Sequence, residues 1–280
     1  MIGIIPAAGK GTRLKPITEA IPKELLHCGS KCLIEHSLES LNICGIKRAC
    51  LITGHKKGPL IDFVKDGSLY GLDIDFAYQT STQGLGHAIL CAKNKIRNND
   101  LDLMVLLGDT VIEPKHILKD LKETHKKENL FATFLLKEVQ DPSRWGVVKL
   151  KNLKNGKGEI EEVFEKPQTP EEQKRFEING KYYAIIGVYC LNQKIFTYLE
   201  NTPRGRNNEI QLTDAIQRGL ENGEKAMGIK FDGNWLDVGA PKTYLLAQWQ
   251  FFKNKTEQDI LKLAEEWDRT AEKINSTQNE

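Results

Sequence analysis

Residues 2–13 read IGIIPAAGKGTR and join an apolar run to a loop of small residues. The apolar run, residues 2–7, predicts a buried strand. Small residues at Ala7, Ala8, Gly9 and Gly11 would let backbone N–H groups approach a polyphosphate closely. The stretch therefore predicts a phosphate-binding loop, with an ordinary tight turn as the alternative.

Two cations follow this loop. Arg13 and Lys23 would place fixed positive charge beside it, and an arginine side chain can hold two phosphate oxygens at once. Spacing excludes two better-known nucleotide loops. A Walker loop needs Gly-Lys-Ser/Thr after a four-residue gap, and a dinucleotide fingerprint needs a third small residue where this chain has Leu14.

Around this stretch, short apolar runs alternate with amphipathic segments, which is typical of a parallel sheet covered by helices on both faces. Strands are expected over residues 2–7, 49–53, 74–79 and 101–107, and helices over residues 33–44, 59–65, 85–95 and 114–127. Further strands are expected over residues 131–138, 146–151, 160–165 and 183–191, with fewer helices between them. The second half should therefore be mixed α+β and extend the same sheet.

Composition narrows the class of protein. The chain has 280 residues and a formal net charge of +2, so it lacks the overall basic field typical of nucleic-acid or anionic-membrane binding. Its apolar runs are too short for a membrane span, and a cytoplasmic location is the default expectation. The six cysteines form no Cys-x-x-Cys pair and are expected to be structural thiols.

Residues 3–26, GIIPAAGKGTRLKPITEAIPKELL, resemble the signature of the sugar-1-phosphate nucleotidyltransferase family, G-x-G-T-R followed further along by P-K. Within that family, QGLGHAILCA at residues 83–92 is most similar to bacterial UTP:glucose-1-phosphate uridylyltransferases. WLDVGAPKTY at residues 235–244 is more similar to the glucose-1-phosphate thymidylyltransferases. Matching motifs run from residue 3 to about residue 250, nearly the whole chain.

The resemblance implies the fold and its division. We expect a Rossmann-like α/β fold of the nucleotide-diphospho-sugar transferase type: a mixed, mainly parallel sheet flanked by helices, with C-terminal helices. The catalytic domain would span residues 1–253, with a nucleotide-binding half at 1–130 and a sugar-binding half at 131–240. Residues 254–280 would form a helical extension, whose apolar stripe includes Ile260, Leu263, Trp267, Ala271 and Ile274. This stripe would pack back on the body or form a subunit contact in a homo-oligomer.

For the nucleotide, the resemblance implies a set of binding residues: Ala7, Ala8, Gly9, Gly11, Thr12, Arg13, Gln79, Gly84 and Asp109. In the family the glutamine and glycine equivalent to Gln79 and Gly84 read a pyrimidine. A carboxamide offers one donor and one acceptor, which match the imide N–H and a carbonyl of uracil or thymine. This pairing does not sense the C5 methyl, so UTP and dTTP are not separated; helix capping is the alternative role. The six histidines show no metal-ligand spacing, and only His87 lies in a family motif.

Two aspartates are the expected metal ligands. Asp109 follows an apolar strand and Gly108, at the sheet edge where open α/β sheets bind ligands. The resemblance implies that Asp109 and Asp237 hold a catalytic Mg²⁺, which typically needs one or two carboxylates plus phosphate oxygens. Capping a helix that starts near Pro241 is the alternative role for Asp237.

The sugar site is implied by further motif matches. VFEKP at residues 163–167 resembles the family's E-K-P motif, and WGVV at 145–148 resembles its Y-G-V-V, with Trp145 in place of tyrosine. The implied sugar-binding residues are Gly146, Glu165, Lys166, Gly187 and Trp235. A plain surface ion pair is the alternative for Glu165 and Lys166.

These matches predict attack by a sugar-phosphate oxygen on the α-phosphorus of a triphosphate. Arg13, Lys23 and Lys166 would be the catalytic cations, since two polyanions must be brought together and their repulsion offset. One alternative is a cytidylyl- or guanylyltransferase for another phosphorylated substrate. Another is a non-catalytic sugar-nucleotide sensor or scaffold subunit, although such a protein would be expected to lose these charges.

Overall fold

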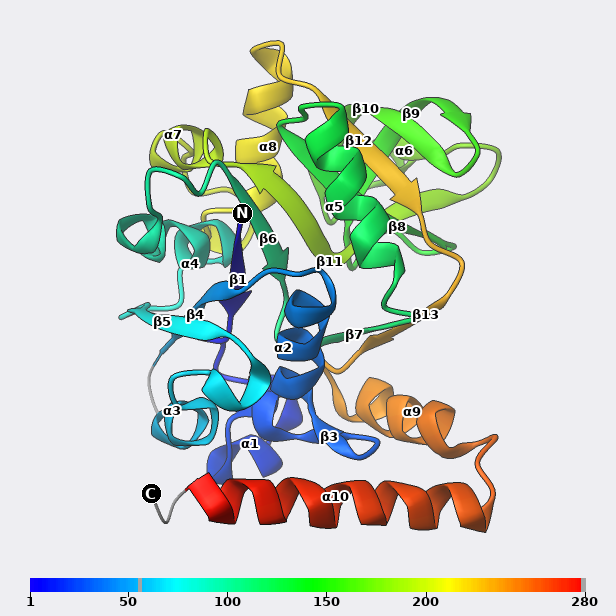
Figure 1. The fold of residues 1–280 in the computed structure, drawn as a ribbon. Coiled ribbons are helices and arrows are strands. Elements are labelled where there is room, and N and C mark those ends of the chain that lie inside the picture. The colour runs from blue at the N-terminus through cyan, green and yellow to red at the C-terminus, as the bar shows by residue number, and fades with distance from the viewer. Residues whose placement is uncertain (55–56, 278–280) are drawn as a thin grey trace.

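The computed structural model describes residues 1–54 and 57–277, and a nine-stranded sheet forms its centre (Figure 1). The strand order across this sheet is β5 (Asp73–Tyr78), β4 (Arg48–Thr53), β1 (Ile2–Pro6), β6 (Asp102–Leu106), β11 (Tyr182–Asn192), β8 (Ala132–Val139), β12 (Ala226–Lys230), β10 (Lys157–Glu165) and β9 (Gly146–Lys154). Neighbours from β5 to β6 pair in parallel, as do β8 and β12, whereas β11 is antiparallel to β6 and β8. The expected α/β fold class is confirmed, and the second half does extend the same sheet.

Two short ribbons lie outside the main sheet. β2 (His27–Cys28) pairs with β3 (Lys31–Cys32), and β7 (Thr110–Glu113) pairs with β13 (Asn234–Asp237). The sequence patterns predict neither ribbon, nor strand β12. The β7–β13 ribbon decides the geometry of the site, because its antiparallel register sets Asp237 opposite Thr110.

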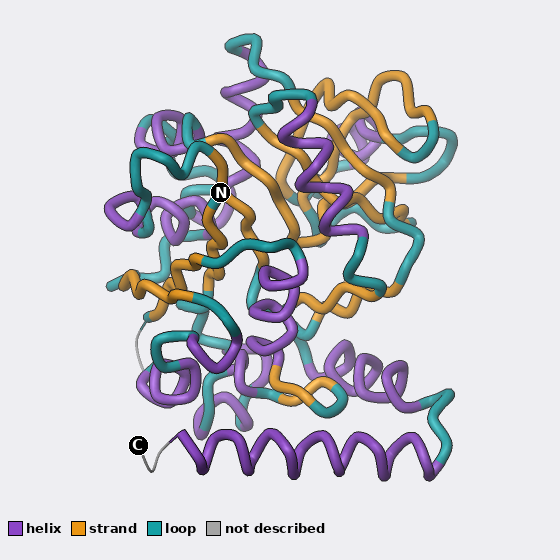
Figure 2. Tube along the Cα trace, viewed as in Figure 1, coloured by secondary structure: helices purple, strands orange, loops and turns teal. Residues whose placement is uncertain are grey.

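Helices cover both faces of the sheet (Figures 1 and 2). They are α1 (Ile17–Ala20), α2 (Leu33–Ile43), α3 (Gly58–Val64), α4 (Leu85–Cys91), α5 (Ile117–Lys127), α6 (Pro170–Phe176), α7 (Ile195–Glu200), α8 (Leu212–Glu221), α9 (Pro241–Phe252) and α10 (Glu257–Thr277). Short 3₁₀ turns occur at Thr12–Leu14, Lys23–Leu25, Ser68–Tyr70, Lys93–Lys95 and Arg206–Asn208. The helix expected over 114–127 starts later, at Ile117, because residues 114–116 form a bend and turn that lead out of β7 (Thr110–Glu113).

Alternate residues of the central strands belong to two separate hydrophobic cores. On β1, Ile4 belongs to the core that also contains Ile89 of α4, whereas Ile5 belongs to the core that contains Leu38 of α2. Successive side chains of a strand point to opposite faces, so a strand that is apolar throughout must be covered on both. The layers are therefore helix, sheet and helix, as the continuous apolar runs predict.

The last two helices differ in how they meet the body. Helix α9 is attached through Gln248, whose Oε1 accepts a hydrogen bond from Gly29 N–H at 3.1 Å. On α10, Ile260 is 47% exposed, while the side chains of Trp267, Ala271 and Ile274, also part of the expected apolar stripe, lie outside the described structure. Within residues 1–54 and 57–277, no helix combines the length and apolar character that a bilayer span requires.

Candidate active site

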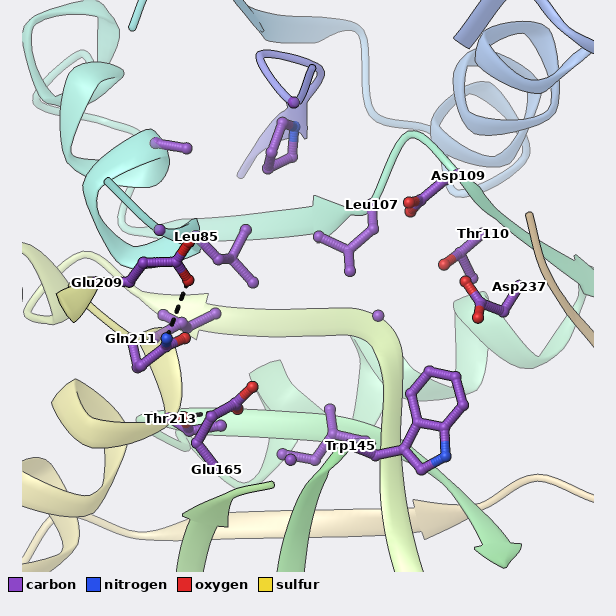
Figure 3. A pocket seen from close by; sticks show the side chains of 18 of the residues that line it. Leu85, Leu107, Asp109, Thr110, Trp145, Glu165, Glu209, Gln211, Thr213 and Asp237 are labelled. Atoms are coloured by element: carbon purple, nitrogen blue, oxygen red, sulfur yellow. Dashed lines mark hydrogen bonds between the residues drawn. The ribbon is translucent and has the colours of Figure 1, made fainter. Parts of the chain in front are cut away.

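A cavity of about 660 Å³ opens at the carboxyl end of the parallel strands (Figure 3). Most of the residues proposed from the sequence line it: Ala8, Gly9, Arg13, Lys23, Gln79, Gly84, Asp109, Gly146, Glu165, Lys166, Gly187, Trp235 and Asp237. Ala7, Gly11 and Thr12 do not line it. The phosphate loop, the two aspartates and the E-K-P motif thus surround one space.

The loop after β1 meets the cavity at Ala8 and Gly9. Ala7 is 1% exposed, and its N–H donates to Ile52 O at 2.8 Å, so this N–H is not available to a phosphate as the sequence suggested. No hydrogen bond within the described ranges uses the backbone N–H groups of residues 8–13. Of these residues Ala8, Gly9 and Arg13 line the cavity, and unpaired backbone donors at such positions are a suitable surface for an anion.

Lys23 supplies the most enclosed positive charge of the site. Its Nζ lies 2.6 Å from Asp109 Oδ2, and the two side chains are 18% and 17% exposed. Burial would lower the pKa of Lys23, but the carboxylates of Asp109 and Glu24 outweigh burial and raise it. Lys23 therefore stays charged at neutral pH and is held in place beside Gly9.

A second, more deeply buried ion pair lies next to the pair formed by Lys23 and Asp109. Lys57 Nζ lies 2.5 Å from Glu24 Oε2, and both side chains are almost fully buried. Glu24 Oε1 has no hydrogen-bond partner in the described structure. Because Glu24 adjoins Lys23 and packs near Gly108, the pair fixes the backbone on both sides of the Lys23–Asp109 contact.

The two aspartates meet through the β7–β13 ribbon. Asp109 precedes β7 and Asp237 ends β13, and Val238 N–H donates to Asp109 O at 2.9 Å. Burial alone would raise the pKa of Asp109, but Lys23, with Arg13 beyond it, holds that pKa below its ordinary value. Burial, and then the Asp109 carboxylate, raise the pKa of Asp237. The two carboxylates face the same side of the cavity in Figure 3.

These two carboxylates fit a divalent cation. Both are hard oxygen donors, and the repulsion that raises the pKa of Asp237 is what a cation between them would relieve. The described residues include no cluster of three or more His, Cys, Asp or Glu side chains able to hold a metal. Any ion at Asp109 and Asp237 would therefore need substrate oxygens or water to complete its coordination.

The loop between β5 and α4 forms one end of the cavity. Gly84 has φ 100°, and a Cβ there would lie 2.6 Å from Ile210 O, so only glycine fits at this position. Hydrogen bonds from Ile210 N–H to Gln83 O and from Gly86 N–H to Ile210 O hold the loop against the chain before α8. Gln79 is 4% exposed and directs its amide nitrogen to Gly84 O at 3.3 Å.

The β9–β10 hairpin forms the opposite end. Its register sets Glu165 opposite Gly146. Glu165 Oε2 accepts from the Thr213 hydroxyl at 3.0 Å, and its Oε1 lies 3.0 Å from Lys166 Nζ. Lys166 has φ 50°, an uncommon backbone for a residue other than glycine, and strain of this kind gathers at binding sites. Gly187, with φ 75°, lies close to the Thr110 hydroxyl.

Two tryptophans and an arginine form the wall beside Asp237. The rings of Trp145 and Trp235 meet edge to face with centroids 4.6 Å apart. The Arg144 guanidinium lies 4.9 Å from the Trp145 ring centroid and 3.8 Å from Asp237 Oδ2. The substitution of tyrosine by Trp145 thus keeps an aromatic ring against Trp235.

A family model described as nucleotidyl transferase matches residues 2–254 of the chain. The chain belongs to this family. Its curated relatives include the low-salt glycan biosynthesis nucleotidyltransferase Agl11 of Haloferax volcanii, 31% identical over 91% of this chain and 67% of the relative. The UTP–glucose-1-phosphate uridylyltransferase AglF of the same organism is 31% identical over 86% of this chain and 93% of the relative. The bifunctional protein GlmU of Methanococcus maripaludis is 35% identical over 90% of this chain, which spans 54% of that relative, about half its length.

Solved structures agree with this assignment. UDP-glucose pyrophosphorylase in complex with UDP-glucose superposes with a TM-score of 0.80 at 29% identity, covering 91% of this chain and 99% of that one. A putative glucose-1-phosphate thymidylyltransferase from Bacillus anthracis gives a TM-score of 0.77 at 26% identity, covering 93% and 99%. The fold is therefore shared with solved structures of nucleotidyl transferases.

Within this nucleotidyl transferase, several cavity residues were not proposed from the sequence as site residues. They are Thr110, Arg144, Gln211 and Thr213. Glu209, for which the resemblance of NEIQLTDA at residues 208–215 to a family pattern predicts a place at the site, also lines the cavity. Glu209 Oε2 accepts from Gln211 Nε2 at 3.1 Å, and Figure 3 shows this contact opposite the aspartates. The same stretch contains Gln211 and Thr213 and could have pointed to them as well. Arg144 carries no such signal beyond standing next to WGVV.

Proposed function

We propose that the chain transfers a nucleotidyl group from UTP or dTTP to a sugar 1-phosphate, with glucose 1-phosphate as the first candidate, and releases pyrophosphate. The observation that carries this proposal is that unpaired N–H groups, four cationic side chains and the two aspartates surround one cavity of about 660 Å³. The cations are Arg13, Lys23, Arg144 and Lys166. Anion-binding groups lie at the Lys23 end and near Lys166. This arrangement supports binding of two phosphate-bearing molecules side by side.

In the proposed reaction, a phosphate oxygen of the sugar 1-phosphate attacks the α-phosphorus in line. The bond from that phosphorus to the bridging oxygen of the β-phosphate breaks, and pyrophosphate leaves with the electron pair. No side-chain nucleophile is needed, because the sugar phosphate is already anionic. The protein's part is to hold the two groups close and to offset their charge.

Each charged residue has a role in this proposal. Arg13 and Lys23 bind the β- and γ-phosphates beside the loop, and Lys166 binds the sugar phosphate. Asp109 and Asp237 would hold Mg²⁺, which would neutralise charge on the phosphate oxygens when bound. Glu165, fixed by Thr213, accepts hydrogen bonds from sugar hydroxyls.

The proposed substrates rest on chemistry and on relatives. AglF and the superposed structures are named for glucose 1-phosphate or UDP-glucose, which supports glucose 1-phosphate and a uracil nucleotide as substrates here. The GlmU relatives match to a similar extent, so the sugar must be found by experiment. The amide of Gln79 supports uracil or thymine over cytosine.

A substrate grid tests the proposal. UTP, dTTP, CTP, GTP and ATP are each combined with several sugar 1-phosphates and Mg²⁺, and pyrophosphate release is measured. We expect turnover with UTP or dTTP, and losses of roughly 10²-fold in Arg13→Ala and Asp109→Ala, about 3 kcal/mol each. Lys15→Ala is the control, because exposed Lys15 pairs with Glu19 and does not line the cavity.

Two results would contradict the proposal. If no pair of substrates released pyrophosphate while nucleotides still bound, the chain would be a sensor or scaffold. If Arg13→Ala and Asp109→Ala kept near-wild-type turnover, the cavity would not be the site of reaction.

A further inference from the structure

The amide of Gln79 is held by two acceptors inside the protein. Its nitrogen lies 3.3 Å from Gly84 O and 2.8 Å from His87 Nδ1. A backbone carbonyl can only accept, so the carboxamide atom that faces it must be the NH₂ group. His87 Nδ1 must then accept the second hydrogen, which places the imidazole proton on Nε2.

This arrangement differs from the expectation that Gln79 offers both a donor and an acceptor to the base. Both amide hydrogens are used within the protein, and only Oε1 is left. Gln79 lines the cavity, and among the described residues no hydrogen bond to its Oε1 is found. Gln79 therefore presents a single acceptor.

Resting on the proposed function, we infer that His87 is a positioning residue for nucleobase selection: it fixes the Gln79 carboxamide with its oxygen toward the base. A fixed acceptor favours a base with a ring N–H at the matching position, which uracil and thymine have. Cytosine carries a lone pair on that ring nitrogen, so two acceptors would face each other. Without His87 only Gly84 O, at 3.3 Å, would orient the carboxamide, so the amide would be held less firmly and would turn its NH₂ group toward cytosine more readily.

The surroundings of His87 fit an acceptor role. The residue lies in the first turn of α4, is partly buried and does not line the cavity, so it acts only through Gln79. Burial and the charge of Arg204 lower its pKa, which keeps the ring neutral and the Nδ1 lone pair available. Cys91, one turn further along, contacts the same nitrogen at 3.9 Å but does not touch the amide.

Three variants test the inference by the ratio of Kd values for CTP and UTP, measured by calorimetry on the full chain without a sugar phosphate. His87→Ala removes the acceptor and suits a helix. His87→Asn restores an acceptor oxygen near the Nδ1 position. Cys91→Ala removes a contact to the same ring and is the matched control.

We expect the preference for UTP over CTP to fall about tenfold or more in His87→Ala, as for the loss of one well-placed hydrogen bond. His87→Asn should keep the ratio within about threefold of wild type, and Cys91→Ala should leave it unchanged. Circular dichroism and thermal melting check that each variant is folded.

Other outcomes would overturn the inference. Equal weakening of both nucleotides in His87→Ala would reduce His87 to a packing residue. The same holds if His87→Asn is no better than His87→Ala, if Cys91→Ala has an equal effect, or if the wild type does not distinguish the two nucleotides. The proposed function fails separately, when the wild type prefers UTP in binding yet releases no pyrophosphate with any sugar 1-phosphate.

Discussion

Replacing Lys23 by methionine should cost both stability and turnover, and the loss of stability should depend on pH. The substitution keeps most of the side-chain volume but leaves Asp109 without the cation 2.6 Å away. Breaking a fully buried ion pair costs about 3–5 kcal/mol. Since the two side chains are 18% and 17% exposed, and Arg13 still acts on Asp109, we expect a loss of about 2 kcal/mol at pH 7.

The pH dependence follows from the two pKa shifts. The folded-state pKa of Asp109 is depressed, so its stabilisation is present above about pH 4 and is lost as pH falls through the folded pKa. The pKa of Lys23 is raised, so its stabilisation is present below about pH 10 and is lost as pH rises through the folded pKa. The difference in unfolding free energy between wild type and Lys23→Met should therefore be flat around neutrality and should shrink in acid.

Urea denaturation of both proteins at pH 7 and near pH 3 measures this difference, and pyrophosphate release at pH 7 should fall by roughly 10²-fold. Lys31→Met is the control, because Lys31 pairs with Glu39 at 3.1 Å but is 42% exposed, and such pairs contribute about 0–1 kcal/mol. An undiminished difference near pH 3, or an equal loss in the control, would refute the reasoning.

Three further predictions concern neighbouring positions. Asp237→Asn removes a carboxylate whose raised pKa costs stability at neutral pH, so the free energy of unfolding in urea should rise by up to about 1 kcal/mol. The variant should lose turnover, and it should not show the rise in Tm that we expect Mg²⁺ to give the wild type; a variant that still responds to Mg²⁺ would contradict this. Gly84→Ala places a Cβ 2.6 Å from Ile210 O at a positive φ, so the free energy of unfolding should fall by more than about 2 kcal/mol. A fall of less than about 0.5 kcal/mol would contradict the close approach. Lys57→Met leaves Glu24 buried and unpaired, so the free energy of unfolding should fall by about 3 kcal/mol. The double variant with Glu24→Gln should recover part of this loss. No recovery would show that the broken ion pair is not the cause.

The sequence predicted those strands and helices whose structure follows from their own local residue pattern. The central strands are apolar throughout, and helix α2 has helical spacing, so both could be located within one or two residues. Strands β7 and β13 have only four residues each, and their pairing depends on a contact between distant segments. Local periodicity cannot show such a contact.

The sequence predicted which residues form the candidate site better than it predicted the hydrogen bonds that these residues make. The resemblance to the nucleotidyltransferase family brought Arg13, Asp109, Lys166 and Asp237 into one proposal, and the fold does set them around one cavity. What the motifs could not show is how donors are already used. The N–H of Ala7 is taken by β4, and both hydrogens of the Gln79 amide are taken by its neighbours.

The β7–β13 ribbon has a consequence for the growing chain on the ribosome. Synthesis runs from the amino end, so the phosphate loop and Asp109 are made first. Strand β7 cannot pair until β13, which is synthesised much later, has left the ribosome. A chain cut short before β13 would hold the loop and one carboxylate but not the second. Truncated products should therefore lack Asp237 beside Asp109, even when their amino-terminal half is folded.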